Sequence, residues 1–97
     1  MNPIKSKSVE IIRTSKFKRD YKREKKTDAR LDEVFISVIG LLLGDDPLPE
    51  RLQDHALGGS WKGCRDCHIR PDLVLIYARS AEALTLVRVG SHSEVFE

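Results

Sequence analysis

The stretch DLVLIYAR at residues 72–79 decides the fold class. Its five middle positions after the aspartate are apolar without interruption, which is typical of a central strand buried on both faces. Residues 80–82 then make a tight connection, and residues 83–89 are expected to form the hairpin partner. Upstream, residues 63–69 are also predicted to be a strand, which Pro71 ends or bends.

The N-terminal third predicts one strand and one helix. Residues 8–13 are rich in β-branched side chains, which favours a short strand. Thr14 or Ser15 is then expected to cap a helix. On this helix Phe17 and Tyr21 lie four residues apart and therefore on one face, while lysine and arginine fill most other positions.

A second helix is expected to begin after Thr27 or Asp28, either of which could cap it. Apolar residues recur on it at helical spacing, namely Leu31, Val34, Phe35, Val38, Leu41 and Leu42. Gly44 is placed to end this helix, and residues 45–49 form a loop. Residues 52–61 show no helical stripe, so they are interpreted as a loop or a ragged sheet edge.

Together these elements predict an α+β domain, with two N-terminal helices packed on a mainly antiparallel sheet of three to four strands. Residues 91–96 add a short C-terminal segment after Gly90. At 97 residues the chain is expected to be a single domain, 1–97. No apolar run is long enough to cross a bilayer and no secretory signal is evident, so we expect a cytoplasmic protein with no membrane association and reduced cysteines.

Charge is distributed unevenly along the chain. Residues 1–30 carry a net charge of +7 and residues 31–97 a net charge of −5. A basic N-terminal third suits a polyanion such as RNA, because phosphates attract clustered lysine and arginine without sequence preference. A solvated helix face would explain the same pattern equally well.

The side chains best suited to chemistry gather in the C-terminal half. They are the three histidines together with one carboxylate, two arginines and an aromatic residue: His55, His68, His92, Asp72, Arg65, Arg88 and Phe96. Because strands bring distant residues together, one small patch could hold several of them. Taken singly, each histidine is as well explained by a structural role.

Two ordered motifs resemble those of YafQ-like toxins, a branch of the RelE superfamily. The first is DHALGGSWKGCRDCHIRPD at residues 54–72, and the second is RVGSHSEVF at residues 88–96. This resemblance implies a RelE-like fold and a toxin of a type II toxin–antitoxin system that cleaves mRNA, usually on the ribosome, without metal or cofactor. It places His55, His68, Asp72, Arg88, His92 and Phe96 in the active site. In this family an aromatic residue often follows the aspartate, whereas Leu73 stands here.

Physical chemistry gives these positions roles. Cleavage without a metal uses the 2′-hydroxyl of RNA as nucleophile, and needs a base, an acid and a cation near the phosphate. We expect His92 to be the general acid and Arg88 to bind the phosphate. Asp72 is either the base or a group that orients His68 or His55. Phe96 would stack on a base or pack on the core, and Arg65 and Lys62 are further substrate-binding candidates.

The resemblance also implies partners. These are the mRNA substrate, the ribosome and a cognate antitoxin, expected in a heterotetramer that reaches operator DNA only through the antitoxin. The first helix is the candidate for docking on ribosomal RNA, through Lys16, Lys18, Arg19, Lys22, Arg23, Lys25 and Lys26.

Three other functions compete with this interpretation. Residues 64–68, CRDCH, match the attachment motif of c-type haem, which would require export to an oxidising compartment. Cys64 and Cys67 with histidines could instead bind zinc, although one such cysteine pair is weak evidence. A catalytically silent module that binds antitoxin or RNA is the third alternative.

Overall fold

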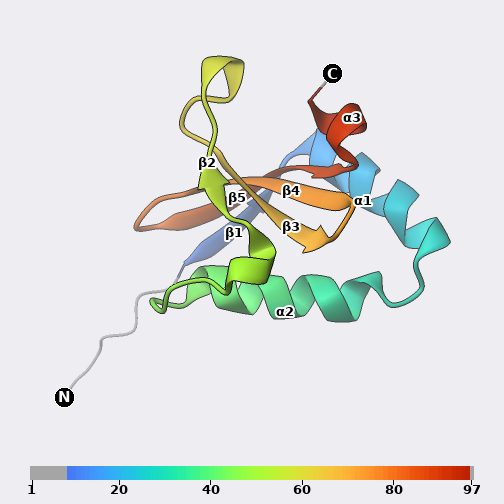
Figure 1. Cartoon of the computed structure of the whole chain (residues 1–97), viewed down its shortest axis with the longest axis horizontal. Coiled ribbons are helices and arrows are strands. Elements are labelled where there is room, and N and C mark those ends of the chain that lie inside the picture. The colour runs from blue at the N-terminus through green and yellow to red at the C-terminus, as the bar shows by residue number, and fades with distance from the viewer. Residues whose placement is uncertain (1–8, 97) are drawn as a thin grey trace.

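The computed structural model describes residues 9–96, which form a five-stranded sheet with helices on one side and at one end (Figure 1). The elements in chain order are β1 (Glu10–Arg13), α1 (Ser15–Thr27), α2 (Leu31–Leu43), the 3-10 helix η1 (Glu50–Leu52), β2 (His55–Ala56), the 3-10 helix η2 (Gly59–Trp61), β3 (Arg65–Arg70), β4 (Leu73–Arg79), β5 (Ala83–Gly90) and α3 (His92–Val95). None of the helices within residues 9–96 is long and apolar enough to cross a membrane.

The sheet is mixed and has more strands than the sequence predicted. Its order is β1-β5-β4-β3-β2, in which β1 pairs with β5 in parallel and the other three pairings are antiparallel. The α+β class is confirmed, but the expectation of three to four strands is wrong. The additional strand β2 is only two residues long and lies at the sheet edge, in the segment interpreted as a loop or a ragged sheet edge, where so short a pairing leaves no alternating pattern.

Helix ends follow the sequence at α1 and depart from it at α2. Thr14 caps α1, because its Oγ1 accepts a hydrogen bond from the backbone N–H of Phe17 at 3.0 Å. The predicted cap of α2 is wrong: α2 starts after Arg30 and has no side-chain cap. The carboxylate of Asp28 is instead bound by Arg70 of β3, at 2.6 Å from Nε, and by the backbone of Arg30. Residue 8 of the predicted first strand lies outside the described residues.

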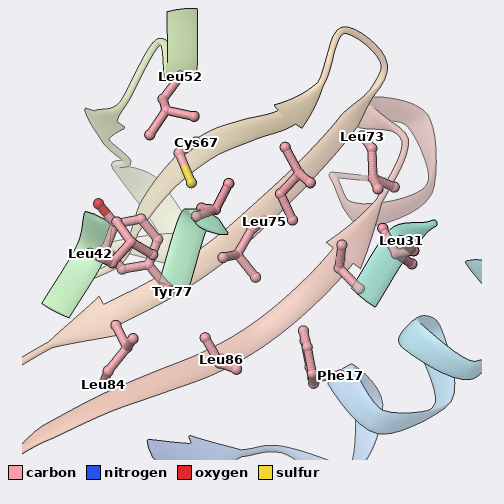
Figure 2. Packing of buried hydrophobic residues seen from close by; sticks show 13 residues of the cluster. Phe17, Leu31, Leu42, Leu52, Cys67, Leu73, Leu75, Tyr77, Leu84 and Leu86 are labelled. Atoms are coloured by element: carbon pink, nitrogen blue, oxygen red, sulfur yellow. The ribbon is translucent and has the colours of Figure 1, made fainter. Parts of the chain in front are cut away.

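The main core fills the space between α2 and one face of the sheet. Figure 2 shows Leu42 of α2 beside Tyr77 of β4 and Leu31 of α2 at the opposite end of the cluster, with Leu75 of β4 and Leu86 of β5 between the two ends. Each of these five side chains is at most 2% exposed. The predicted helical stripe is therefore confirmed as the face that α2 buries. At the end of this core the ring of Phe17 stacks on that of Tyr21, with centroids 5.7 Å apart.

Candidate active site

The sheet face opposite this core carries the histidines. One row of directly paired residues runs across four strands, from β2 to β5, through His55, Asp66, Ile76 and Arg88. Residues paired in this way point to the same face, and at about 4.8 Å per strand the row spans roughly 14 Å. The next row adds His68, which is paired with Val74. The backbone thus gathers two histidines, a carboxylate and a guanidinium on one surface.

A bulge in β5 decides which face Arg88 occupies. One extra residue, Val87, lies between the pairs that Leu86 and Arg88 form with β4. Leu86 points into the main core, and strict alternation would send Arg88 to the same side; the extra residue turns it to the histidine face instead. The Oγ1 of Thr14 donates a hydrogen bond to the carbonyl oxygen of Val87 at 2.8 Å, so the start of α1 fixes the bulge.

His55 is held through Nδ1, and its other ring nitrogen makes no hydrogen bond within residues 9–96. Its Nδ1 lies 2.9 Å from the carbonyl oxygen of Gln53 and 3.1 Å from Oδ1 of Asp66. A hydrogen bond to a carbonyl oxygen requires the proton on Nδ1, which leaves Nε2 of the neutral ring as an acceptor. The side chain is 57% exposed. His55 can therefore take a proton from a bound substrate.

Asp66 is buried beneath these imidazoles. It is 1% exposed, and its Oδ1 has no hydrogen-bond partner in the described part of the chain. Burial raises the pKa of this carboxyl above its ordinary value, and the nearby charges of His55, His68 and His92 oppose that rise. A carboxylate below several imidazoles stabilises whichever of them carries a proton.

His92 reaches the site from α3, next to His68. The two rings have centroids 5.3 Å apart, and the ring of His92 lies 5.7 Å from that of Phe96. Phe96 is half-buried and meets the ring of Trp61 edge-on at 6.2 Å. A capping box fixes the start of this four-residue helix, since the Ser91 side chain accepts from the backbone of Glu94 and the Glu94 side chain from that of Ser91.

Gly90 allows α3 to fold back closely on the sheet. A Cβ at this position would lie 3.1 Å from Nη2 of Arg23, 3.1 Å from Oε1 of Glu94 and 3.2 Å from Cγ1 of Val95. A larger residue would therefore push against α1 and α3 together. The glycine places His92 beside the start of β4, since Gly90 itself pairs with Val74.

Arg88 is held by a carboxylate from α1. Its Nε and Nη2 donate to Asp20 at 2.6 and 3.1 Å, and its side chain is 20% exposed. Asp20 itself is 4% exposed. The hydrogen bond to Asp20 raises the pKa of Arg88, so the guanidinium stays charged.

The remaining predicted site residues lie at different distances from this surface. Asp72 is exposed in the turn between β3 and β4, at the sheet end where His92 emerges, and no hydrogen bond or ion pair joins it to a histidine within residues 9–96. Lys62 is exposed directly after η2, in the loop that stands off the sheet in Figure 1. Arg65 is paired with Tyr77 and so shares the face of the main core, where its Nη2 lies 2.7 Å from Oδ2 of Asp54. The structure does not bring Arg65 to the histidine face.

The two cysteines lie away from the histidines. Cys67 is fully buried in the main core, where its thiol is not accessible for haem attachment, and burial raises the pKa of this thiol to about 12, which opposes the thiolate that zinc ligation needs. Cys64 is half-buried just before β3. Within residues 9–96 no three histidine, cysteine or acidic side chains are arranged to hold a metal ion.

Sequence reasoning missed two carboxylates. Asp66 stands two positions before His68, and on a strand that spacing puts both side chains on one face. This signal was available in the sequence. Asp20 gives only a weak signal, since it is one of two acidic residues in a helix rich in lysine and arginine, and its contact with Arg88 spans 68 positions.

Comparisons with known proteins relate this chain to bacterial toxins. A family model described as "Bacterial toxin of type II toxin-antitoxin system, YafQ" matches residues 9–97. The mRNA interferase toxin YafQ of Escherichia coli K12 is 33% identical over 87 residues, which are 90% of this chain and 95% of that protein. The putative toxin YafQ of Haemophilus influenzae is 50% identical over 64 residues, but that match spans only 62% of this chain and 63% of the relative.

Solved structures match along most of the chain. A copper-bound mutant toxin from Helicobacter pylori is 39% identical, with a TM-score of 0.83, and the match covers 91% of this chain and 99% of that one. YafQ in the E. coli DinJ-YafQ complex is 33% identical, with a TM-score of 0.75, covering 93% of this chain and 100% of that one.

Proposed function

Because the chain belongs to the YafQ family of bacterial toxins of type II toxin–antitoxin systems, we propose that it is an endoribonuclease that cleaves mRNA. The observation that carries the proposal is the single surface on which His55, His68 and His92 lie over the buried Asp66, in the same paired row as Arg88. Such a surface offers a base, an acid and a cation for one phosphodiester.

The reaction begins at the ribose. His55 accepts the proton of the 2′-hydroxyl on its free Nε2, and the 2′-oxygen attacks the adjacent phosphorus. The carboxylate of Asp66, 3.1 Å from Nδ1, stabilises the imidazolium that forms. In this proposal Asp66, rather than Asp72, is the carboxylate that orients His55. Asp72 keeps the proposed place of a second base or a substrate contact at the open end of the sheet.

His92 gives its proton to the departing 5′-oxygen as the bond from phosphorus to that oxygen breaks. The products are a 2′,3′-cyclic phosphate and a 5′-hydroxyl, so the proton removed at the 2′-position is balanced by the one delivered to the leaving group. The ring centroid of His68 lies 5.3 Å from that of His92, so His68 is close enough to act as a second base or to bind the phosphate.

Arg88 and Phe96 bind the substrate in this proposal. The planar guanidinium matches two phosphate oxygens and stabilises the charge that grows on them during attack. The half-buried Phe96, between His92 and Trp61, offers an aromatic face to a nucleotide base next to the scissile bond. Lys62, beyond Trp61, would meet the phosphate backbone further along.

We also propose that ribosome-bound mRNA in the cytoplasm is the substrate, and that the exposed cations of α1 dock on ribosomal RNA. Lys18, Lys22 and Lys26 are all exposed and recur every four residues along one side of α1. Lys25 is less available, since its Nζ pairs with Asp32 at 2.7 Å. A cognate antitoxin would hold the toxin inactive in a heterotetramer and supply the contacts to operator DNA; the E. coli relative solved with DinJ supports such a partner.

The test is cleavage of a defined mRNA on purified ribosomes by the wild type and by His92→Ala. We expect the substitution to lower the single-turnover rate roughly 10²- to 10⁴-fold, because it removes the general acid. Arg13→Ala, an exposed cation on the edge strand β1, is the control and is expected to cleave normally. Equal rates for wild type and His92→Ala would refute the assigned site, and an inactive wild type would favour the silent binding module.

Metal dependence is tested in the same assay. The mechanism above uses side chains only, so a chelator is expected to leave the rate unchanged. Since a relative from H. pylori has been solved with copper bound, added copper is a necessary second arm. A rate that falls with chelator and returns with copper would contradict the metal-free mechanism.

A further inference from the structure

Helix α1 contributes a buried carboxylate to the back of the candidate active site. Oδ2 of Asp20 accepts hydrogen bonds from Nε of Arg88 at 2.6 Å and from the backbone N–H of Val89 at 3.2 Å. Oδ1 accepts from Nη2 of Arg88 at 3.1 Å. Asp20 therefore binds both the guanidinium of Arg88 and the backbone of β5, the strand that carries Arg88.

These hydrogen bonds leave one edge of the Arg88 guanidinium available. Asp20 takes the edge formed by Nε and Nη2, so the edge formed by Nη1 and Nη2 remains, and that edge is the fork that matches two phosphate oxygens. Within residues 9–96, the side chain of Arg88 forms hydrogen bonds with Asp20 alone. Its free edge is therefore unoccupied while its orientation is fixed.

Arg23 also approaches this carboxylate. Its Nη1 lies 3.4 Å from Oδ1 of Asp20, so one carboxylate is shared by two guanidinium groups, while Nη2 of Arg23 is itself paired with Glu24 at 3.2 Å. Burial pushes the pKa of Asp20 upward, but the hydrogen bonds from Arg88 and Val89 and the charges of both arginines lower it below its ordinary value. Asp20 is thus ionised at neutral pH.

The same contacts extend to the helix that carries His92. Nη2 of Arg23 lies 3.5 Å from the carbonyl oxygen of Val89 and 3.6 Å from Oε1 of Glu94, the residue that closes the capping box of α3. Arg23 therefore connects the carboxylate behind Arg88 to the start of α3.

We propose that Asp20 is a positioning residue for phosphodiester cleavage, which holds the free edge of Arg88 toward the scissile phosphate. The inference rests on the proposed ribonuclease function. Asp20 does not touch the substrate, so its loss leaves RNA binding largely intact and slows the chemical step. A small displacement of a phosphate-binding group costs roughly 10- to 100-fold in rate.

The experiment measures single-turnover cleavage of ribosome-bound mRNA, well below the melting temperature of every variant and normalised to the folded fraction. Asp20→Asn is compared with Asp32→Asn, which also removes an ion-paired carboxylate, but one bound to Tyr21 and Lys25 away from the histidine face. We expect Asp20→Asn to lower the cleavage rate roughly 10- to 100-fold with little change in RNA affinity, and Asp32→Asn to cleave like the wild type.

A double-mutant cycle separates positioning from stability. In an Arg88→Ala background, Asp20→Asn is expected to cause no further loss of rate, because the group it positions is gone. A purely structural role predicts the same loss in both backgrounds. Asp20→Glu is the second variant: it keeps the charge but moves the guanidinium, so it should slow cleavage even after normalisation to the folded fraction.

The outcomes are distinguishable. If the wild type and Asp32→Asn do not cleave RNA, the proposed function itself fails. If they cleave and Asp20→Asn or Asp20→Glu cleaves equally fast, the function stands and the inference about Asp20 is overturned. Equal losses from Asp20→Asn in the presence and absence of Arg88 would also overturn it.

Discussion

Replacing Asp66 with asparagine is expected to stabilise the protein and to impair it at the same time. The carboxylate is 1% exposed, and its Oδ1 accepts no hydrogen bond in the described residues, although Nδ1 of His55, which bonds to Gln53, lies 3.1 Å away. Each unit by which burial raises a pKa costs the ionised form about 1.4 kcal/mol at neutral pH. The amide carries no charge but leaves polar atoms in the same buried place, so only the penalty for burying a charge is removed. We therefore expect the free energy of unfolding of Asp66→Asn to rise by about 1 kcal/mol at neutral pH.

The pH dependence fixes the sign of this effect. Burial raises the pKa of Asp66 in the folded state above its ordinary value of 3.8. Between these two values the folded chain holds more protons than the unfolded chain, so the stability of the wild type falls as pH rises through that interval. The advantage of Asp66→Asn should therefore be complete above the interval and disappear below pH 3.8.

The measurement is thermal unfolding of both proteins at about pH 7.5 and at about pH 3, where a change of 1 kcal/mol shifts the melting temperature of a domain of this size by about 4–8 °C. Asp46→Asn, in the exposed loop after α2, is the control and is expected to change little at either pH. In parallel, cleavage by Asp66→Asn should fall roughly 10-fold or more, because the imidazolium of His55 loses its counter-charge. A variant less stable than the wild type at neutral pH, or one whose advantage persists unchanged in acid, would refute the reasoning.

Two further changes test the substrate contacts. Phe96→Leu should reduce cleavage at limiting RNA while the melting temperature stays close to that of the wild type, because the half-buried ring packs mainly on His92 and Trp61; wild-type cleavage would remove the stacking role. Charge reversal at Lys18, Lys22 and Lys26 to glutamate should weaken ribosome binding in sedimentation assays and reduce its salt dependence, and unchanged affinity would rule out docking through α1.

The sequence predicted the elements whose patterns are local. The apolar run of β4 and the helical stripe of α2 both identify their elements, because burial imposes a period on the residues themselves. The two-residue β2 was anticipated only as a loop or a ragged sheet edge, and the parallel pairing of β1 with β5 was missed, since both depend on contacts with other strands. The predicted cap of α2 was wrong because the carboxylate of Asp28 binds Arg70, 42 positions away.

The candidate site, like the fold, could be predicted only in part. The motifs identified the histidines, and the structure brings His68 and His92 together. The face of Arg88 could not be read from alternation, because it depends on the extra residue Val87 in β5. The role of Asp20 could not be predicted for a different reason. Nothing near it in the sequence indicates that a carboxylate on a basic helix turns inward to bind a strand 68 positions later.

The parallel pairing of β1 with β5 sets the order in which this molecule can be completed during translation. Glu10 pairs with Ala83, and the bulge that directs Arg88 is tied to Thr14 across 73 positions. At typical elongation speeds that separation corresponds to roughly 4–15 s of synthesis. During this interval β1 has no strand partner and Asp20 lacks the guanidinium of Arg88. A nascent chain therefore cannot assemble the candidate active site until β5 and α3 have been made, so a chain shorter than that is not expected to cleave the messages being read around it.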